Sequence, residues 1–184
     1  MQIDLELYRE DIEIGDLPFH LSAIDVNPEA AQRTIVFVHG FGGRAVQWEK
    51  QMRFFSDENR VIAIDLRGHG YSSAPDSSYS MAEVQADLNA ALAKLKVPDK
   101  FVLVGHSFGG AIVATYAERN PQRLEKLILI ATAGEFTINY WARLAFKLPV
   151  TTLNVIRPFA RRSLFAPPHV LKAFHNNNMA QFNG

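Results

Sequence analysis

The sequence has no cysteine among its 184 residues, which excludes disulfide bonds, a cysteine nucleophile and thiolate metal sites. It also lacks an apolar run of the roughly 18 residues that a membrane-spanning helix needs. The first residues alternate acidic and apolar side chains, so we expect no signal peptide. Lys and Arg balance Asp and Glu at 19 each, which gives no reason to expect nucleic acid as a partner. These absences favour a cytoplasmic protein.

Acidic residues are missing from the last part of the chain. Residues 136–184 contain no Asp or Glu, and their cations are Arg143, Lys147, Arg157, Arg161, Arg162 and Lys172. Apolar residues recur there at helical spacing and no strand is expected. We therefore predict two parts, a core over residues 1–134 and an incomplete helical lid over residues 135–184. The basic lid leaves open a contact with a lipid surface.

The core alternates runs typical of strands with segments typical of helices. Runs suited to strands buried on both faces of a parallel sheet are 34–38, 61–64, 101–104 and 127–130. An antiparallel edge pair is expected at 3–14 and 19–26, and helical spacing follows at 48–55, 81–95 and 111–118. This order predicts an α/β fold, with a mostly parallel sheet and helices on both of its faces.

One stretch carries the clearest chemical signal. The strand-forming residues 101–104 run into Gly105-His106-Ser107-Phe108-Gly109, a Gly-x-Ser-x-Gly pattern, and a helix of small residues follows. A strand, a sharp turn and a helix in this order raise the serine hydroxyl at the carboxyl edge of a sheet. Glycines before and after the serine let strand and helix approach closely. The serine is therefore the candidate nucleophile of this chain.

Two further motifs occur in register with the serine. His39-Gly40-Phe41-Gly42-Gly43 follows the strand at 34–38, and Asp65-Leu66-Arg67-Gly68-His69-Gly70-Tyr71-Ser72 follows the strand at 61–64. Together the three motifs resemble the lid-bearing α/β-hydrolase superfamily, in its serine-nucleophile branch. The resemblance covers the whole chain and implies an α/β-hydrolase fold with a helical lid after the sixth strand. It also implies that the last two strands of that fold are missing, as in a C-terminally truncated member.

The resemblance assigns roles to individual residues. It makes Ser107 the nucleophile and the backbone N–H groups of Phe41 and Phe108 the oxyanion hole. Residues that would support these motifs are His39, Gly40, Gly105, His106 and Gly109. It implies no metal and no organic cofactor. Asp65 and Arg67 are interpreted as a hydrogen-bonded pair within a structural turn.

The catalytic acid and base are not found where the usual chain order, serine then acid then histidine, would place them. The candidates after the serine are Glu135 as acid and His169 or His175 as base, and for each of them a surface position on the lid is the preferred interpretation. We therefore expect the 184-residue chain alone not to be efficiently active. The acid and base would belong to the full-length enzyme.

The function that these observations favour is a serine hydrolase that forms an acyl-enzyme on Ser107. Its expected substrate is a small-molecule carboxylic ester or a related acyl compound, in the manner of an esterase or lipase. A serine disfavours the dehalogenase and epoxide-hydrolase branches, which attack with a carboxylate. A C–C bond hydrolase or a cofactor-free perhydrolase on the same scaffold stays open, and so does a non-catalytic ligand-binding pseudoenzyme or an inactive fragment. The oligomeric state is left open.

Overall fold

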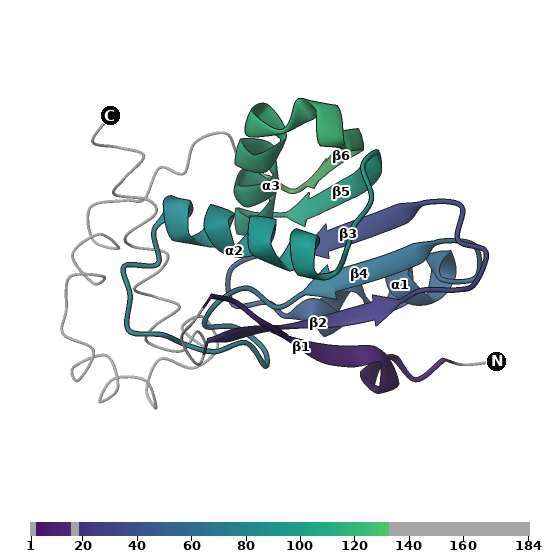
Figure 1. Cartoon of the computed structure of the whole chain (residues 1–184), viewed down its shortest axis with the longest axis horizontal. Helices are drawn as coiled ribbons and strands as arrows, with labels where there is room; N and C mark the ends of the chain where they lie inside the picture. Colours follow the sequence, from purple (N-terminus) through teal and green to yellow (C-terminus); the bar gives the residue numbers. More distant parts are fainter. Residues whose placement is uncertain (1–2, 16–18, 133–184) are drawn as a thin grey trace.

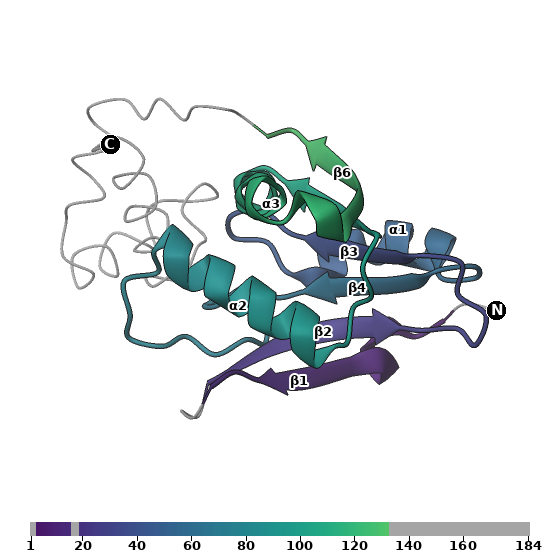
Figure 2. The same ribbon diagram turned by 45° about the horizontal axis from the view of Figure 1, so that its top comes forward.

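One six-stranded sheet organises residues 3–15 and 19–132, which are the residues that the computed structural model describes. In space the strands follow the order β1-β2-β4-β3-β5-β6 (Figures 1 and 2). Their bounds are β1 Arg9–Glu13, β2 His20–Val26, β3 Thr34–Val38, β4 Arg60–Ile64, β5 Phe101–His106 and β6 Leu124–Ile130. The first two strands are antiparallel additions, whereas β3, β4, β5 and β6 run parallel to one another.

The central strands are apolar on both sides because both faces of the sheet are covered. Every residue of β3 is buried. Val36 and Val38 pack in the cluster that includes α2 (Met81–Lys94) and α3 (Phe108–Arg119). Ile35 and Phe37 point the other way, toward η2 (Ala45–Trp48) and α1 (Glu49–Phe55). The prediction of an α/β fold with helices on both faces of the sheet is confirmed, as Figure 2 shows.

Local sequence signals set several helix boundaries as expected. The Ser80 side chain accepts a hydrogen bond from the backbone of Glu83, and the Glu83 carboxylate accepts one from the backbone of Ser80. This reciprocal pair is a capping box, which satisfies amides that the first turn of α2 would otherwise leave without partners. The turn at Asn120-Pro121 ends α3 and leads through η3 (Pro121–Arg123) into β6.

The N-terminal prediction was wrong in part. We expected an edge strand over residues 3–14, but Leu5–Tyr8 form a 3₁₀ turn (η1) and the strand begins only at Arg9. The Asp4 carboxylate accepts the Glu6 amide and so caps this turn. Leu5 is buried against the α1 face of the sheet, whereas Leu7 is 81% exposed. The alternation of apolar residues alone predicts a strand here, but the hydrogen bond from the Asp4 side chain stabilises a turn that competes with strand pairing.

The four parallel strands place their following loops along one edge of the sheet. Residues 39, 65, 107 and 131 each come directly after one of these strands. Ligands of open α/β sheets bind outside the carboxyl ends of the strands, so this edge is the place to look for a site. The predicted core boundary at residue 134 and the lid over residues 135–184 lie outside the described residues.

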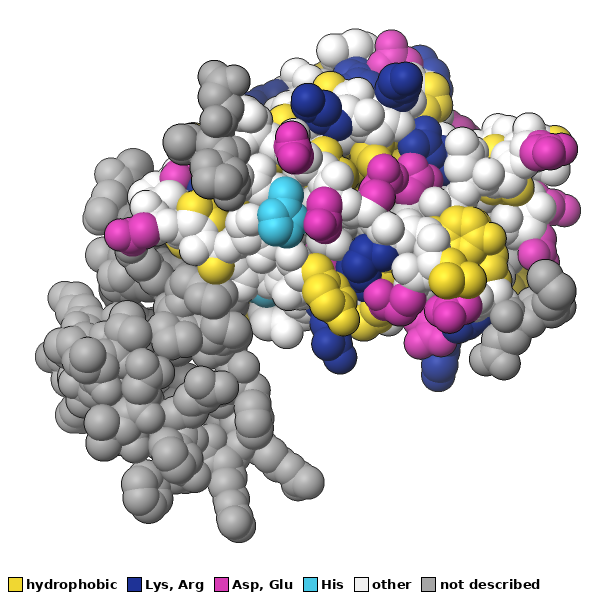
Figure 3. Space-filling model, turned by 60° about the horizontal axis from the view of Figure 1, so that its bottom comes forward, with side chains coloured by type: hydrophobic (Ala, Val, Ile, Leu, Met, Phe, Trp, Pro, Cys, Tyr) yellow, Lys and Arg dark blue, Asp and Glu magenta, His cyan; other side chains and the backbone are white. Residues whose placement is uncertain are grey.

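The described surface carries mixed charges. On the side shown in Figure 3, acidic and basic side chains are interspersed among polar and isolated apolar ones. None of the helices within residues 3–15 and 19–132 combines the length and the apolar character of a membrane-spanning helix. In the same ranges, His, Asp and Glu side chains do not gather in a group of three or more that could hold a metal ion.

Candidate active site

Ser107 occupies a strained turn between β5 and α3. Its backbone has φ 52° and ψ −118°, a conformation that residues with a side chain rarely adopt. The surroundings fix it, because its N–H donates to the Ile130 carbonyl at 2.9 Å and its carbonyl accepts the Gly110 amide at 2.9 Å. Such a conformation costs on the order of 1–3 kcal/mol and persists only where neighbouring structure enforces it. The serine of the Gly-x-Ser-x-Gly pattern thus stands at the kind of strained turn that the pattern predicts.

Two glycines bring the loop after β3 against this turn. A Cβ added to Gly109 would lie 2.3 Å from the His39 carbonyl oxygen, so only glycine lets the start of α3 touch the end of β3. A Cβ added to Gly40 would lie 3.1 Å from the Cβ of Ser107. The Gly40–Phe41 peptide is therefore beside the serine, as the sequence motifs led us to expect.

His39 sets the direction of that peptide. Its Nδ1 donates to the Gly40 carbonyl at 2.8 Å, and the same carbonyl also accepts the Gly43 amide at 3.0 Å. No described peptide bond is cis, and in a planar trans peptide the N–H points opposite to the C=O. The Phe41 N–H is consequently directed away from the buried His39 ring. The His39 ring thus contacts the carbonyl of the loop that we expected it to support.

Burial keeps the His39 imidazole neutral. The ring is fully buried, and the resulting desolvation, together with the nearby His69 and His106, lowers its pKa from 6.5 to about 3, although donation to the Gly40 carbonyl acts in the opposite direction. The neutral ring can donate through Nδ1 while Nε2 accepts the Leu66 amide at 3.0 Å. A protonated ring would lose this acceptor.

Stability is expected to depend on pH through His39. Between pH 6.5 and about 3 the unfolded chain binds a proton on this residue that the folded chain does not. The stabilisation is therefore complete above pH 6.5 and is lost as the pH falls toward 3, by at most about 1.4 kcal/mol per pH unit. Urea unfolding from pH 4 to 8, compared between the native chain and His39→Gln, measures this slope. An identical slope in the two proteins would contradict the assignment.

The other predicted motif residues lie at the same turn. Phe108 is the first residue of α3, and its side chain packs in the core at 6% exposure. The first amides of a helix have no acceptor within the helix, and the helix N-terminus favours negative charge. His106 turns toward the α1 side, where its Nδ1 is 3.3 Å from Gln47 Nε2 and its ring packs edge-on against Trp48. His106 is thus a structural neighbour of the turn.

Asp65 and Arg67 do not pair with each other, so that prediction was wrong. The buried Asp65 carboxylate accepts hydrogen bonds from the backbone amides of Ala45 (2.5 Å) and Tyr71 (3.1 Å) and from the Arg9 guanidinium (3.1 Å). Arg67 instead reaches α2 and binds Asp87 through two hydrogen bonds, of 2.5 Å and 2.7 Å. The turn is structural, as expected, but its partners come from distant elements.

The described residues do not provide Ser107 with a hydrogen-bonded acid or base. Within residues 3–15 and 19–132, no hydrogen bond joins the Ser107 hydroxyl to an imidazole or a carboxylate. Glu135, His169 and His175, the candidates for acid and base, all lie outside these ranges. The described part of the site therefore holds the serine turn and the loop beside it.

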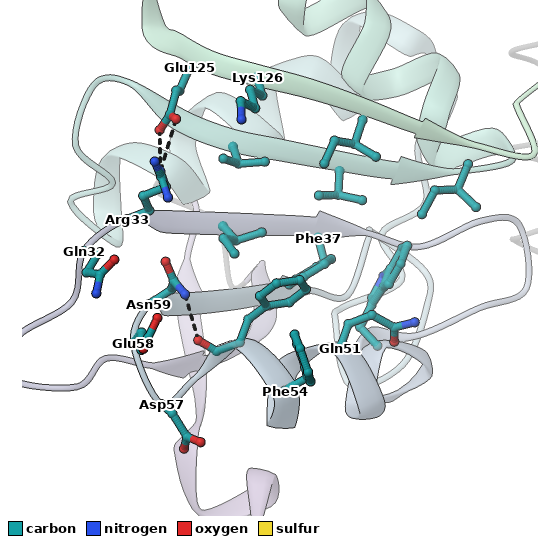
Figure 4. A pocket seen from close by; sticks show the side chains of 17 residues that line it. Gln32, Arg33, Phe37, Gln51, Phe54, Asp57, Glu58, Asn59, Glu125 and Lys126 are labelled. Carbon is teal, nitrogen blue, oxygen red and sulfur yellow. Dashed lines mark hydrogen bonds and ion pairs between the residues drawn. The ribbon is translucent and has the colours of Figure 1, made fainter.

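An apolar groove of about 640 Å³ lies away from the serine, on the α1 face of the sheet (Figure 4). Its lining includes Phe37, Phe54, Val104 and Ile128, and the Arg33–Glu125 ion pair closes one end. Strand β6 forms the edge of the described sheet, and residues 127–130 are 38–46% exposed. Among the described residues, β6 therefore pairs with a strand on one side only.

Comparison with known proteins agrees with this architecture. A family model described as the alpha/beta hydrolase fold matches residues 33–176. A probable 1-acylglycerol-3-phosphate O-acyltransferase from rice is 36% identical over 124 residues, which is 65% of this chain and 30% of the relative. Mouse epoxide hydrolase 4 is 37% identical over 121 residues, 65% of this chain and 33% of the relative. The chain thus spans about a third of the length of these curated relatives.

Solved structures give the same result. A thermophilic esterase from Thermogutta terrifontis superposes with a TM-score of 0.70 at 26% identity, covering 94% of this chain and 72% of the esterase. A probable hydrolytic enzyme from Pseudomonas aeruginosa superposes with a TM-score of 0.62, also at 26% identity, covering 91% of this chain and 59% of that protein. From the matched family model, the strand order and the strained serine turn, we conclude that the chain belongs to the α/β-hydrolase fold family.

Proposed function

We propose that this chain carries the nucleophile and the oxyanion hole of a serine hydrolase that cleaves a carboxylic ester or a related acyl compound. The observation that carries the proposal is the strained Ser107 turn with the Gly40–Phe41 peptide packed against it. A hydroxyl raised on such a turn can approach a carbonyl carbon, while nearby backbone amides receive the negative charge that develops on the carbonyl oxygen.

In the proposed reaction, the Ser107 hydroxyl oxygen attacks the ester carbonyl and its proton passes to a general base outside the described residues. The Phe41 and Phe108 amides bind the resulting oxyanion. Collapse of this intermediate releases the alcohol, which takes up the proton, and leaves the acyl group on the serine. Water then adds to the acyl-enzyme and releases the carboxylic acid. Each amide donor contributes on the order of 10²–10³ in rate.

The relatives support hydrolysis as the reaction class. The structural neighbours include the thermophilic esterase and the probable hydrolytic enzyme. Mouse epoxide hydrolase 4 is another relative, but epoxide opening by a carboxylate nucleophile needs an acid at the position that Ser107 occupies here. A serine suits acyl transfer, because the ester that it forms can be hydrolysed. We therefore infer the substrate class from the serine nucleophile and not from the name of the epoxide hydrolase relative.

Acyl transfer to an alcohol is a second candidate. The rice relative and an Arabidopsis relative, 34% identical over 119 residues, are both named 1-acylglycerol-3-phosphate O-acyltransferases. The first half-reaction would be the same, with an acyl group on Ser107. The two functions differ only in whether water or an acceptor hydroxyl attacks the acyl-enzyme. An assay that supplies both acceptors separates them.

Pre-steady-state kinetics with p-nitrophenyl esters tests the proposal. We expect the full-length enzyme to release a burst of p-nitrophenol that approaches one equivalent per protein molecule, followed by a slower steady phase, because acylation and deacylation are separate steps. Saturable ester binding with no burst and no turnover would indicate a non-catalytic ligand-binding protein. If the acyl group then appears on an added alcohol rather than in free acid, the transferase alternative is favoured.

A further inference from the structure

Two histidines link the loop after β3 to the loop after β4. His39, on the first loop, accepts the Leu66 amide of the second through Nε2 at 3.0 Å. His69, on the second loop, accepts the Gly42 amide of the first through Nε2 at 3.3 Å. Both rings are buried, and their centroids are 5.0 Å apart. The loops therefore exchange one hydrogen bond in each direction.

Each ring also binds a carbonyl of its own loop. His39 Nδ1 lies 2.8 Å from the Gly40 oxygen, and His69 Nδ1 lies 3.0 Å from the Arg67 oxygen. A carbonyl can only accept and an amide N–H can only donate, so each imidazole carries its proton on Nδ1 and a lone pair on Nε2. Each neutral ring thus bridges the two loops in the same way, by donating to a carbonyl of its own loop and accepting an amide of the other loop.

The bridges fix the peptides on both sides of Phe41. His39 holds the carbonyl of the Gly40–Phe41 peptide, and His69 holds the amide of the Phe41–Gly42 peptide. Gly42 has φ +68°, and no atom of the described residues lies within 4 Å of the position of a Cβ, so the residue itself restricts the loop little. The His69 and Phe41 rings also make a T-shaped contact, with 6.4 Å between centroids. External contacts therefore set the Phe41 backbone.

We propose that His69 is a positioning residue for the oxyanion hole: by holding the Gly42 amide it orients the Phe41 backbone, whose N–H binds the oxyanion. This inference rests on the proposed function for its catalytic consequence but not for its structural one. His69 itself touches no reacting atom. The sequence pattern alone does not indicate this role, although His69 lies between Gly68 and Gly70 in the same motif as Asp65.

Two substitutions separate the two hydrogen bonds of His69. The amide of His69→Asn can still donate to the Arg67 carbonyl but is too short to reach Gly42. His69→Gln is long enough to place its side-chain oxygen near the position of Nε2 and to accept the Gly42 amide. In the full-length enzyme we expect His69→Asn to slow fluorophosphonate labelling of Ser107 by about 10–100-fold, since small displacements of a donor cost about that much. His69→Gln should restore most of the rate.

Amide exchange gives a readout that does not depend on catalysis. We expect the Gly42 N–H to exchange at least about tenfold faster in His69→Asn, while the Leu66 N–H, which His39 holds, stays protected. Tyr71→Ala is the matched control, because this 60% exposed ring lies on the same loop and a surface substitution should change the labelling rate by no more than about twofold.

The outcomes distinguish the two proposals. If the native chain is not labelled at Ser107, the proposed function fails, and exchange at Gly42 still tests the bridge. If His69→Asn exposes Gly42 but labels at the native rate, the positioning role is overturned. If Gly42 and Leu66 lose protection together with a general loss of stability, His69 is a residue of the fold rather than of the oxyanion hole, which also overturns the inference.

Discussion

Replacing Ser107 with alanine is expected to lower ester hydrolysis by the full-length enzyme by at least about 10⁴-fold and to remove covalent labelling by a fluorophosphonate. The reason is chemical, because alanine offers no oxygen to carry the acyl group, whereas the backbone turn at φ 52° is retained. Mass spectrometry of the labelled native protein should locate the adduct on the peptide that contains Ser107. Labelling that survives in Ser107→Ala would place the nucleophile elsewhere and refute the proposed mechanism.

Ser107→Gly serves as a control for the fold. Glycine adopts positive φ without steric cost, so relief of strain at this position should raise the free energy of unfolding by about 1 kcal/mol while activity is lost as in the alanine variant. Urea unfolding measures the difference between the two variants. If the glycine variant were no more stable than the alanine variant, the turn would not store strain at the serine.

Gly109→Ala is expected to cost about 3 kcal/mol or more of stability and most of the activity. In an ordinary helix this change would be favourable by up to about 1 kcal/mol. Here the added methyl would lie 2.3 Å from the His39 carbonyl oxygen and 2.6 Å from that of Val38. Backbone atoms at the end of β3 cannot rotate aside, so α3 must move away from the loop that holds Phe41. Thermal unfolding and the labelling rate of Ser107 measure the two effects.

Gly15→Ala is the matched control for this substitution. Gly15 has φ +70°, and no atom of the described residues lies within 4 Å of an added Cβ, so alanine meets backbone strain but no collision with them. We expect a loss of about 1 kcal/mol and no change in labelling. Equal losses of stability in the two variants would show that close contact between α3 and β3 is not what requires glycine at position 109.

Much of the fold could be predicted from the sequence because its signals are local. Continuous apolar runs mark strands that are buried on both faces, and β3 is an example. The Ser80–Glu83 capping box marks the start of α2 through contacts within one turn. The serine turn was also predictable, since strand formers, Gly105 and Gly109 lie within a few residues of it. The alternating residues 3–8 misled us because a short cap competes there with strand pairing.

The partners of the site residues could not be predicted in the same way. Asp65 is held by Arg9, which lies 56 positions away, and Arg67 binds Asp87 rather than its neighbour in the motif. The role of His69 depends on a contact with Gly42, 27 positions earlier. Such contacts depend on which strands become neighbours in the sheet. No short segment of the sequence specifies the order β1-β2-β4-β3-β5-β6.

The order of strands and helices and the position of the serine turn follow from the local sequence, because both arise from interactions within a few residues. The hydrogen bonds between the loops after β3 and β4, and the direction of the Phe41 amide, depend instead on contacts between distant parts of the chain. The physical reason is that a hydrogen bond orients a peptide only when its partner is brought within about 3 Å, and packing of the sheet brings these loops together.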